Sequence, residues 1–356
     1  MRTILSYKII LLTSLLAILG GCRKEILHEI GVRQIEEEKE PVEAGTTWTL
    51  VEKSPTDILC LQAYDNKLFI GGEFEGTGFD HLCSYYKGNF SKGLNGSIIG
   101  DGVFDMQIIQ NRLWIGGNFS YLDIGREYDN LVYLDKNSLG GLNFGEWLST
   151  DIEGLMTYNG NLYVRGYINN NRANIKTKHI EKVVGTSIVG FEQGISEPIN
   201  DFVFFKNKMY VAGDDEFEDD VFLFGFWENG KWNAFENIDR ASILDRAYAV
   251  EVFNNKLVLI GDESFKRPTS IQMYDGNTVQ NIQDISIGAG KTKVIGSSLY
   301  VFGRGITING VSESNIIRFD GSQWTPVGSL SREITDVELY DDSLFAATSR
   351  GLYILE

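Results

Sequence analysis

The sequence contains little proline, cysteine or histidine, with 5, 3 and 3 residues of these types in a chain of 356. Glycine, with 39 residues, and aromatic residues, at 12%, are common. This composition excludes collagen, which needs abundant proline, and a disordered chain, which lacks apolar residues. It favours many short β-strands joined by tight turns.

Basic side chains are also scarce. The chain has 32 Lys and Arg against 49 Asp and Glu, a formal net charge of −17, and no basic block offsets this excess. Nucleic acid is therefore not expected as a partner, because phosphate contacts need clustered Lys and Arg.

The one long hydrophobic run lies near the N-terminus, where Arg2 and Lys8 precede the 11-residue, largely apolar run Ile9–Leu19. This length is typical of a signal peptide and too short to span a bilayer. The run ends in Leu19-Gly20-Gly21-Cys22, which resembles the lipobox of bacterial lipoproteins. The resemblance implies cleavage before Cys22, a diacylglyceryl thioether on it and an acyl chain such as palmitate on its amine. The alternative is an ordinary secretory signal with a chance cysteine.

We therefore predict a signal peptide at 1–21, a lipidated, charged tether at 22–45 and one folded domain at 46–356. Three acyl chains would anchor the protein stably to a membrane. Residue 23 is Arg rather than Asp, which resembles the outer-membrane branch of lipoprotein sorting. We expect a lipid-anchored outer-membrane protein, on either the periplasmic or the cell-surface side.

The rest of the chain repeats one unit: an apolar run, a two-residue polar turn and a second apolar run that mostly ends in Gly. Turn pairs such as Asp65-Asn66 and Asn254-Asn255 tolerate the positive φ that tight hairpins require. Seven copies recur at intervals of 42–49 residues, and their first apolar residues after the turn are Leu68, Leu113, Leu162, Met209, Leu257, Leu299 and Leu344. This period predicts an all-β, seven-bladed β-propeller of four-stranded antiparallel blades.

The seventh unit supplies only three strands. The segment 46–51 has the character of a fourth strand, and Trp48 matches Trp324 of an earlier unit. We predict that this N-terminal strand completes the last blade and closes the ring, which removes an exposed sheet edge.

Two of the units carry paired glycines, in Ile70-Gly71-Gly72 and Ile115-Gly116-Gly117, followed by Phe74 and Phe119. They resemble kelch-like propeller repeats of the type Leu-Tyr-Val-Gly-Gly-x-Phe. The resemblance implies the propeller fold and does not select one function, because propellers host binding, scaffolding and several chemistries.

Motifs for catalysis and metal binding are missing. The sequence has no H-E-x-x-H, no paired C-x-x-C, no Gly-x-Ser-x-Gly and no phosphate-binding loop, and only His81 and His179 lie outside the tether. We expect no catalytic residue, metal or cofactor.

Cys60 and Cys83 fall on the first and third strands of one blade, about 9–10 Å apart, which disfavours a disulfide. The exported location favours oxidation, but the separation of the two strands opposes it, so buried free thiols are favoured and a bridge stays the alternative.

One repeat position on the innermost strands is notable, eight residues before each alignment point. Cys60, Gly154 and Ala249 occupy it in three units, and Asp105, Asp201, Asp336 and Lys291 occupy it in the others. Innermost strands line the central channel of a propeller, so these side chains either bond neighbouring blades or form a polar ring that contacts a ligand or ion.

Variable loops offer a second type of site. We expect the longest face loops at Phe119–Asn130 and Ile168–His179, and the second is locally basic through Arg172, Lys176 and Lys178. The acidic segment 214–220 is expected to be a solvated loop, with calcium binding as the alternative.

These observations favour a lipid-anchored binding or scaffold module for a protein or glycan partner. The alternative is a carbohydrate epimerase, lyase or hydrolase with its site at the mouth of the central channel.

Overall fold

The computed structural model describes residues 47–356, except for 75–77, 124–125, 137, 143–147, 171–178, 185–186, 191–198, 214–223, 229–230, 235–243, 245, 263–268, 312–313 and 329. The described residues belong to one compact unit, Val42–Glu356. Within them no helix is long and apolar enough to cross a membrane. The signal peptide, the tether, Cys22, the basic residues Arg172, Lys176 and Lys178 and the acidic segment 214–220 lie outside the described residues, so the sites proposed there stay predictions.

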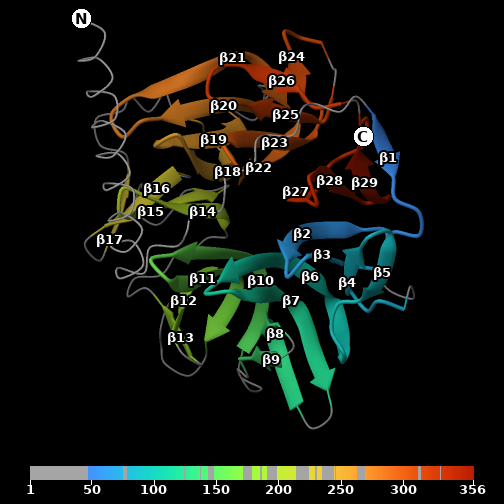
Figure 1. Cartoon of the computed structure of the whole chain (residues 1–356). Coiled ribbons are helices and arrows are strands. Elements are labelled where there is room, and N and C mark those ends of the chain that lie inside the picture. Colours follow the sequence, from blue (N-terminus) through green and yellow to red (C-terminus); the bar gives the residue numbers. More distant parts are fainter. Residues whose placement is uncertain are drawn as a thin grey trace, which may run out of the picture. The chain divides into compact units, whose positions relative to one another are not determined.

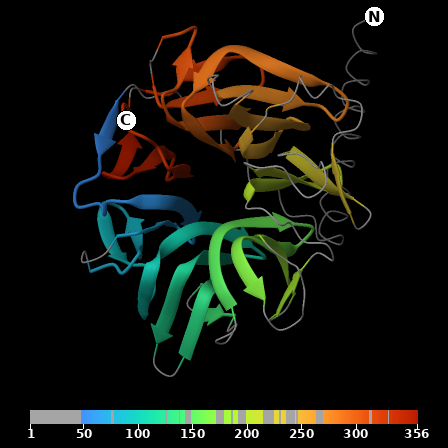
Figure 2. The same cartoon turned by 180° about the vertical axis from the view of Figure 1, so that it is seen from behind.

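The described strands form seven antiparallel sheets, the blades of a propeller (Figures 1 and 2). The all-β, seven-bladed fold expected from the repeats is therefore confirmed. In the first six blades the chain runs from the innermost strand outwards. Blade one consists of β2 (Ile58–Tyr64), β3 (Lys67–Gly72), β4 (Leu82–Tyr86) and β5 (Asn89–Lys92). Blade two consists of β6 (Ser97–Ile109), β7 (Arg112–Asp123), β8 (Arg126–Asp135) and β9 (Ser138–Gly141).

The next three blades follow in the same order. Blade three consists of β10 (Leu148–Tyr158), β11 (Asn161–Asn170), β12 (His179–Val184) and β13 (Ser187–Gly190). Blade four consists of β14 (Ile199–Phe205), β15 (Lys208–Gly213), β16 (Phe224–Glu228) and β17 (Lys231–Ala234). Blade five consists of β18 (Arg246–Phe253), β19 (Lys256–Asp262), β20 (Thr269–Tyr274) and β21 (Val279–Ile287).

The chain of blade six contributes a short strand to blade five. Blade six consists of β22 (Ala289–Ile295), β23 (Ser298–Arg304), β25 (Ile316–Phe319) and β26 (Trp324–Pro326). The segment between β23 and β25 contains β24 (Thr307–Ile308), which pairs with β21 and gives blade five a fifth strand. The hydroxyls of Ser286 and Thr307, 2.7 Å apart, reinforce this link.

Blade seven consists of β27 (Asp336–Tyr340), β28 (Ser343–Thr348), β29 (Gly351–Leu355) and β1 (Trp48–Leu50). Figure 1 shows β1, in blue, beside β29, in red. Trp48 pairs with Leu355, is only 8% exposed and donates its indole N–H to the carbonyl oxygen of Val327 at 3.0 Å. It begins the outer strand of its blade, as Trp324 does in blade six. The predicted closure by an N-terminal strand is confirmed.

The hairpins between first and second strands close as the sequence indicates. Asp65 and Asn66 have φ of 49° and 59°, and Asn254 and Asn255 have φ of 48° and 58°. The outer hairpin loops that contain Asp275-Gly276 and Asp320-Gly321 are longer than two residues. At Asp320-Gly321 the loop has four residues, because the Asp320 carboxylate accepts hydrogen bonds from the backbone N–H groups of Ser322 and Gln323, at 2.7 and 2.9 Å.

Neighbouring blades pack face to face, so each apolar cluster joins two of them. One cluster, for example, combines Tyr64 and Phe69 of blade one with Met106 and Leu113 of blade two. The repeated glycines allow this approach. A Cβ atom on Gly71 would lie 2.5 Å from the Val103 side chain of the next blade.

The predicted face loop Phe119–Asn130 is wrong in part. Its described residues extend β7 and β8, because Tyr121 and Tyr128 face each other across the two strands and stack at 6.5 Å. Residues 168–170 of the second predicted loop likewise belong to β11. Cys60 and Cys83 are buried and unbridged, as favoured above.

Candidate functional site in the central channel

The three aspartates of the shared repeat position make the same pair of hydrogen bonds. One oxygen accepts the backbone N–H of the following residue, as Met106 N donates to Asp105 Oδ1 at 2.8 Å. The other accepts a backbone N–H from the next blade. These bonds join Leu155 N to Asp105 Oδ2 (2.7 Å), Val250 N to Asp201 Oδ2 (3.0 Å) and Leu61 N to Asp336 Oδ2 (2.7 Å).

The backbone of the innermost strand explains this arrangement. An innermost strand has a sheet neighbour on one side only, so alternate N–H groups on its channel side lack a β-sheet acceptor. A carboxylate from the preceding blade supplies that acceptor. Asp105 and Asp201 each follow a β-bulge, between Val103 and Asp105 and between Ile199 and Asp201, where the strand register shifts. Bulges re-aim side chains in this way.

Other residues link the blades where the shared position holds no Asp. Cys60 lies with its Sγ 3.7 Å from the carbonyl oxygen of Val103 in blade two. In blade three the position is Gly154, and Arg165 occupies the space, because a Cβ on Gly154 would lie 2.7 Å from Arg165 Nε. Arg165 donates to the carbonyl oxygen of Ile199 in blade four at 3.3 Å and pairs with Glu153 at 3.1 Å.

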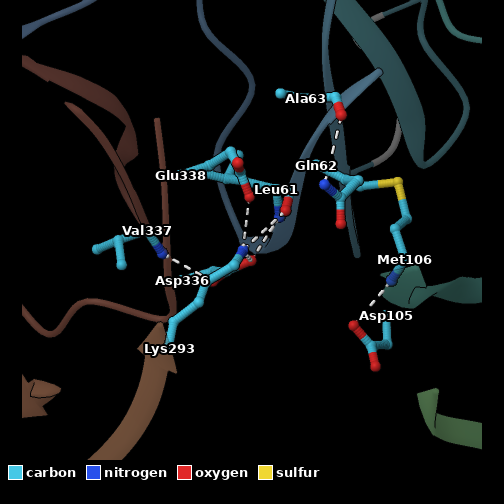
Figure 3. A network of polar contacts seen from close by, with 9 residues as sticks. All are labelled: Leu61, Gln62, Ala63, Asp105, Met106, Lys293, Asp336, Val337 and Glu338. Atoms are coloured by element: carbon cyan, nitrogen blue, oxygen red, sulfur yellow. Dashed lines mark hydrogen bonds and ion pairs between the residues drawn. The ribbon is translucent and has the colours of Figure 1, made fainter. Parts of the chain in front are cut away.

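Lys293 joins three blades at one point of the channel (Figure 3). Its Nζ lies 2.8 Å from Glu338 Oε2 and 3.2 Å from Asp336 Oδ1 in blade seven, and it donates to the carbonyl oxygen of Leu61 in blade one at 3.2 Å. Burial lowers the pKa of Lys293, but the two carboxylates outweigh it and hold that pKa above its usual range. The ion pair is thus a charged junction between blades six, seven and one.

Sequence reasoning missed Lys293 and Glu338. Both stand two residues after a residue of the shared position, Lys291 and Asp336, and a spacing of two places side chains on the same face of a strand. The spacing was visible in the sequence. Their pairing was not, because it depends on how adjacent blades are rotated.

A cavity of about 220 Å³ opens among these strands. All four residues predicted to line the channel border it, together with two further basic residues: Asp105, Asp201, Asp336, Lys291, Lys293 and Arg165. Lys291 is exposed, and its charge, with that of Arg165, partly offsets the burial that raises the pKa of Asp201. The structure thus brings the predicted ring together. Its role toward a ligand stays a prediction.

Two carboxyl groups of the channel strands titrate near neutral pH. Burial, with a smaller contribution from the charge of Asp336, raises the pKa of Asp105 to about 6. Burial, with a contribution from Asp201, raises the pKa of Glu251 to about 7. In both cases hydrogen bonds from backbone N–H groups oppose the rise without cancelling it.

These shifts predict that the protein becomes more stable as the pH falls from about 7 to about 5. The folded state holds protons in this range that the unfolded chain, with ordinary carboxyl pKa values, does not hold. Thermal melts at pH 7.5 and 5.5 should therefore give a higher Tm at pH 5.5. Glu251→Gln should raise the Tm at pH 7.5 and reduce the difference. An equal Tm difference in Glu251→Gln and wild type would contradict the assignment to Glu251.

Among the described residues no group of three or more His, Cys, Asp or Glu side chains is placed to hold a metal ion. His81 and His179 are buried, and each directly precedes or begins the third strand of its blade with a positive φ. The two histidines thus hold equivalent positions in blades one and three.

The fold defines the chain as a seven-bladed β-propeller, and solved structures of this kind are similar to it. The extracellular domain of BT4673, a proposed hybrid two-component system of B. thetaiotaomicron, has a TM-score of 0.55 at 12% identity, over 88% of this chain and 40% of that one. The computationally designed protein Ika8 has a TM-score of 0.52 at 12% identity, over 88% and 99%. An acylaminoacyl peptidase of Pyrococcus horikoshii has a TM-score of 0.51 at 11% identity, over 84% and 51%.

This chain therefore spans less than two thirds of the length of the BT4673 domain and of the peptidase. No protein-family profile matches the sequence, and no curated protein is similar to it at a significant level. At these identities the likeness establishes the fold alone.

Proposed function

We propose that this protein is a lipid-anchored binding module of the outer membrane, built on a kelch-like propeller and presenting a rigid ring to a protein or glycan partner. The observation that carries the proposal is the use of the channel carboxylates. Asp105, Asp201 and Asp336 each commit both oxygens to backbone N–H donors of two blades. These carboxylates, which could otherwise be taken for catalytic groups, therefore hold the blades together. A rigid ring of this kind suits a fixed recognition surface.

The sequence supports the location. The Leu19-Gly20-Gly21-Cys22 box follows a signal-like run, and Arg23 follows the cysteine. The BT4673 domain, a propeller on the extracellular side of a membrane, is a precedent for this fold outside the cell. Whether the ring faces the periplasm or the cell exterior is a question for protease treatment of intact cells.

A second candidate is an enzyme acting on carbohydrate at the channel. One observation favours it: Asp105 and Glu251 have pKa values of about 6 and about 7, in the range suited to general acid–base catalysis. Arg165 and Lys291 could then bind an anionic group. Against this, both oxygens of Asp105 already accept backbone hydrogen bonds.

The anchor is tested by Cys22→Ser. We expect this change to move the protein from the membrane pellet to the soluble fraction and to leave the precursor uncleaved at this site, because the thioether forms on the Cys22 sulfur. Cys60→Ser serves as a control: it changes one of the two other cysteines of the chain and should stay in the pellet. Membrane retention of Cys22→Ser would refute lipid anchoring.

Binding is separated from catalysis by incubating the full chain with soluble polysaccharides. If the protein only binds, the polysaccharide is retained by the protein and its size and composition are unchanged on chromatography. Shortened or epimerised saccharide, lost in Asp105→Asn, would refute the proposal in favour of the enzyme.

A further inference from the structure

A groove lies between blades five and six, and none of the residues that line it borders the cavity of the central channel. Its volume is about 700 Å³, within the range of roughly 300–1,000 Å³ usual for ligand sites. Its apolar lining comes from Phe253 and Met273, which are buried, and from the half-buried Ile282, Phe319 and Trp324. Lys256 is the only charged residue that borders it in the described part of the chain.

The aromatic wall of the groove is preorganised. The rings of Phe319 and Trp324 stack, with centroids 4.7 Å apart and planes 21° apart. Phe253 meets Phe319 edge-on at 5.8 Å, which supports this pair from the core. Trp324 is only partly buried and borders the groove, so part of its indole is available to a ligand.

The polar rim consists of amides and a hydroxyl. Asn281 is exposed, and its Oδ1 accepts a hydrogen bond from Gln272 at 2.6 Å, so its orientation is fixed. Its amide NH₂ makes no hydrogen bond to any residue that the structure describes, and it is a free donor. Ser322, in the loop ordered by Asp320, keeps its hydroxyl oxygen as an acceptor. Asn254 and Gln280, both exposed, add two further amides to the rim.

A second groove of the same kind shows that this chemistry is not dictated by the fold. It lies between blades one and two and has a volume of about 470 Å³. Leu134 and Leu139 occupy there the places of Phe319 and Trp324, since each pair faces across the outer hairpin of its blade. Charged residues border this second groove from several sides: Asp65, Lys67, Lys92, Asp123 and Lys136. The groove of blades five and six is thus distinguished by its uncharged, aromatic and amide lining.

We propose that the groove between blades five and six binds a neutral glycan. An indole face packs against the C–H groups of a sugar ring, while amides supply both donors and acceptors to hydroxyl groups. A ligand without charge also matches the near absence of charge on the groove and avoids repulsion from a chain of net charge −17. This inference rests on the proposed binding function and gives it a ligand class and a site.

The test is affinity electrophoresis of the full chain in native gels that contain dextran, laminarin, mannan or xyloglucan. We expect at least one of these neutral polymers to retard the protein, and polygalacturonate to leave its migration unchanged. Trp324→Ala should weaken the affinity about tenfold or more, in line with loss of an aromatic anchor. The matched control is Trp232→Ala, which removes the tryptophan at the equivalent place in blade four and should bind as wild type.

Trp324→Ala could also loosen blade six, so a second variant keeps the packing. Gln280→Trp places a bulky side chain at an exposed position on the groove and should abolish retardation with little change in Tm. The inference is overturned if none of the neutral polymers retards the protein. It is also overturned if Gln280→Trp binds as strongly as wild type. If binding persists in both variants, the binding function stands and only the assigned site is wrong; if the polymer is depolymerised, the non-catalytic function itself is wrong.

Discussion

Deletion of residues 46–51 is expected to abolish the single cooperative unfolding transition of the propeller and to increase aggregation. The deletion removes β1, leaves blade seven with three strands and exposes the edge of β29. It also removes Trp48, which fills the space beside Val327 and Leu355. Unpaired strand edges and lost packing favour both outcomes. Thermal melts followed by circular dichroism, with light scattering, measure them.

Two further variants test whether β1 itself causes this effect. Deletion of residues 23–45 should leave the melting transition nearly unchanged, because this segment precedes β1. Trp48→Ala should cost about 3–5 kcal/mol, the usual effect of removing a large buried aromatic side chain. If the two deletions melt alike, the N-terminal strand does not hold the ring closed.

Lys293→Met is expected to lower the free energy of unfolding by about 3 kcal/mol, as when one partner of a buried ion pair is removed. The change leaves Asp336 and Glu338, 15% and 12% exposed, without their shared cation. Denaturant unfolding measures the effect. Lys291→Met is the matched control: this lysine is exposed on the same strand, and its loss should change stability by less than about 0.5 kcal/mol. Equal effects of the two variants would rule out the charged junction.

The aspartates of the shared position extend this test. Asp105→Ala and Asp201→Ala should each cost about 1–3 kcal/mol, because two backbone N–H groups lose their acceptor. A ligand-binding role alone would leave stability unchanged or improved, as when repelling charges have been kept for function. Stable variants would therefore favour a ligand site at the channel.

The sequence was sufficient for the architecture because local patterns carry it. Asp65-Asn66 and Asn254-Asn255 determine where the chain turns, and the alternation of turns and apolar runs gives the number of blades. Closure was predictable from a missing strand at one end and Trp48 at the other. These features depend on neighbours in the chain, so they can be read without coordinates.

The channel contacts were less predictable. The repeat placed Asp105, Asp201 and Asp336 at one level but did not show that each reaches the backbone of the following blade. The arginine that replaces a carboxylate in blade three, Arg165, comes from the second strand, so no alignment of first strands could find it. The segment Phe119–Asn130 was expected to be a loop. The stacking of Tyr121 on Tyr128, which extends the strands there, is a contact between two strands and cannot be read from the sequence.

The closing strand has a mechanical consequence. If the chain is tethered through Cys22, a pulling force between membrane and partner reaches the closing strand at Thr47 and Trp48, where the backbones of Thr47 and Glu356 exchange two hydrogen bonds. Rupture there would open the ring at the junction of its two chain ends. These backbone bonds, together with the Trp48 indole that donates to the carbonyl oxygen of Val327, bear such a force directly. Their strength would limit the load that the anchored propeller can carry before it unravels.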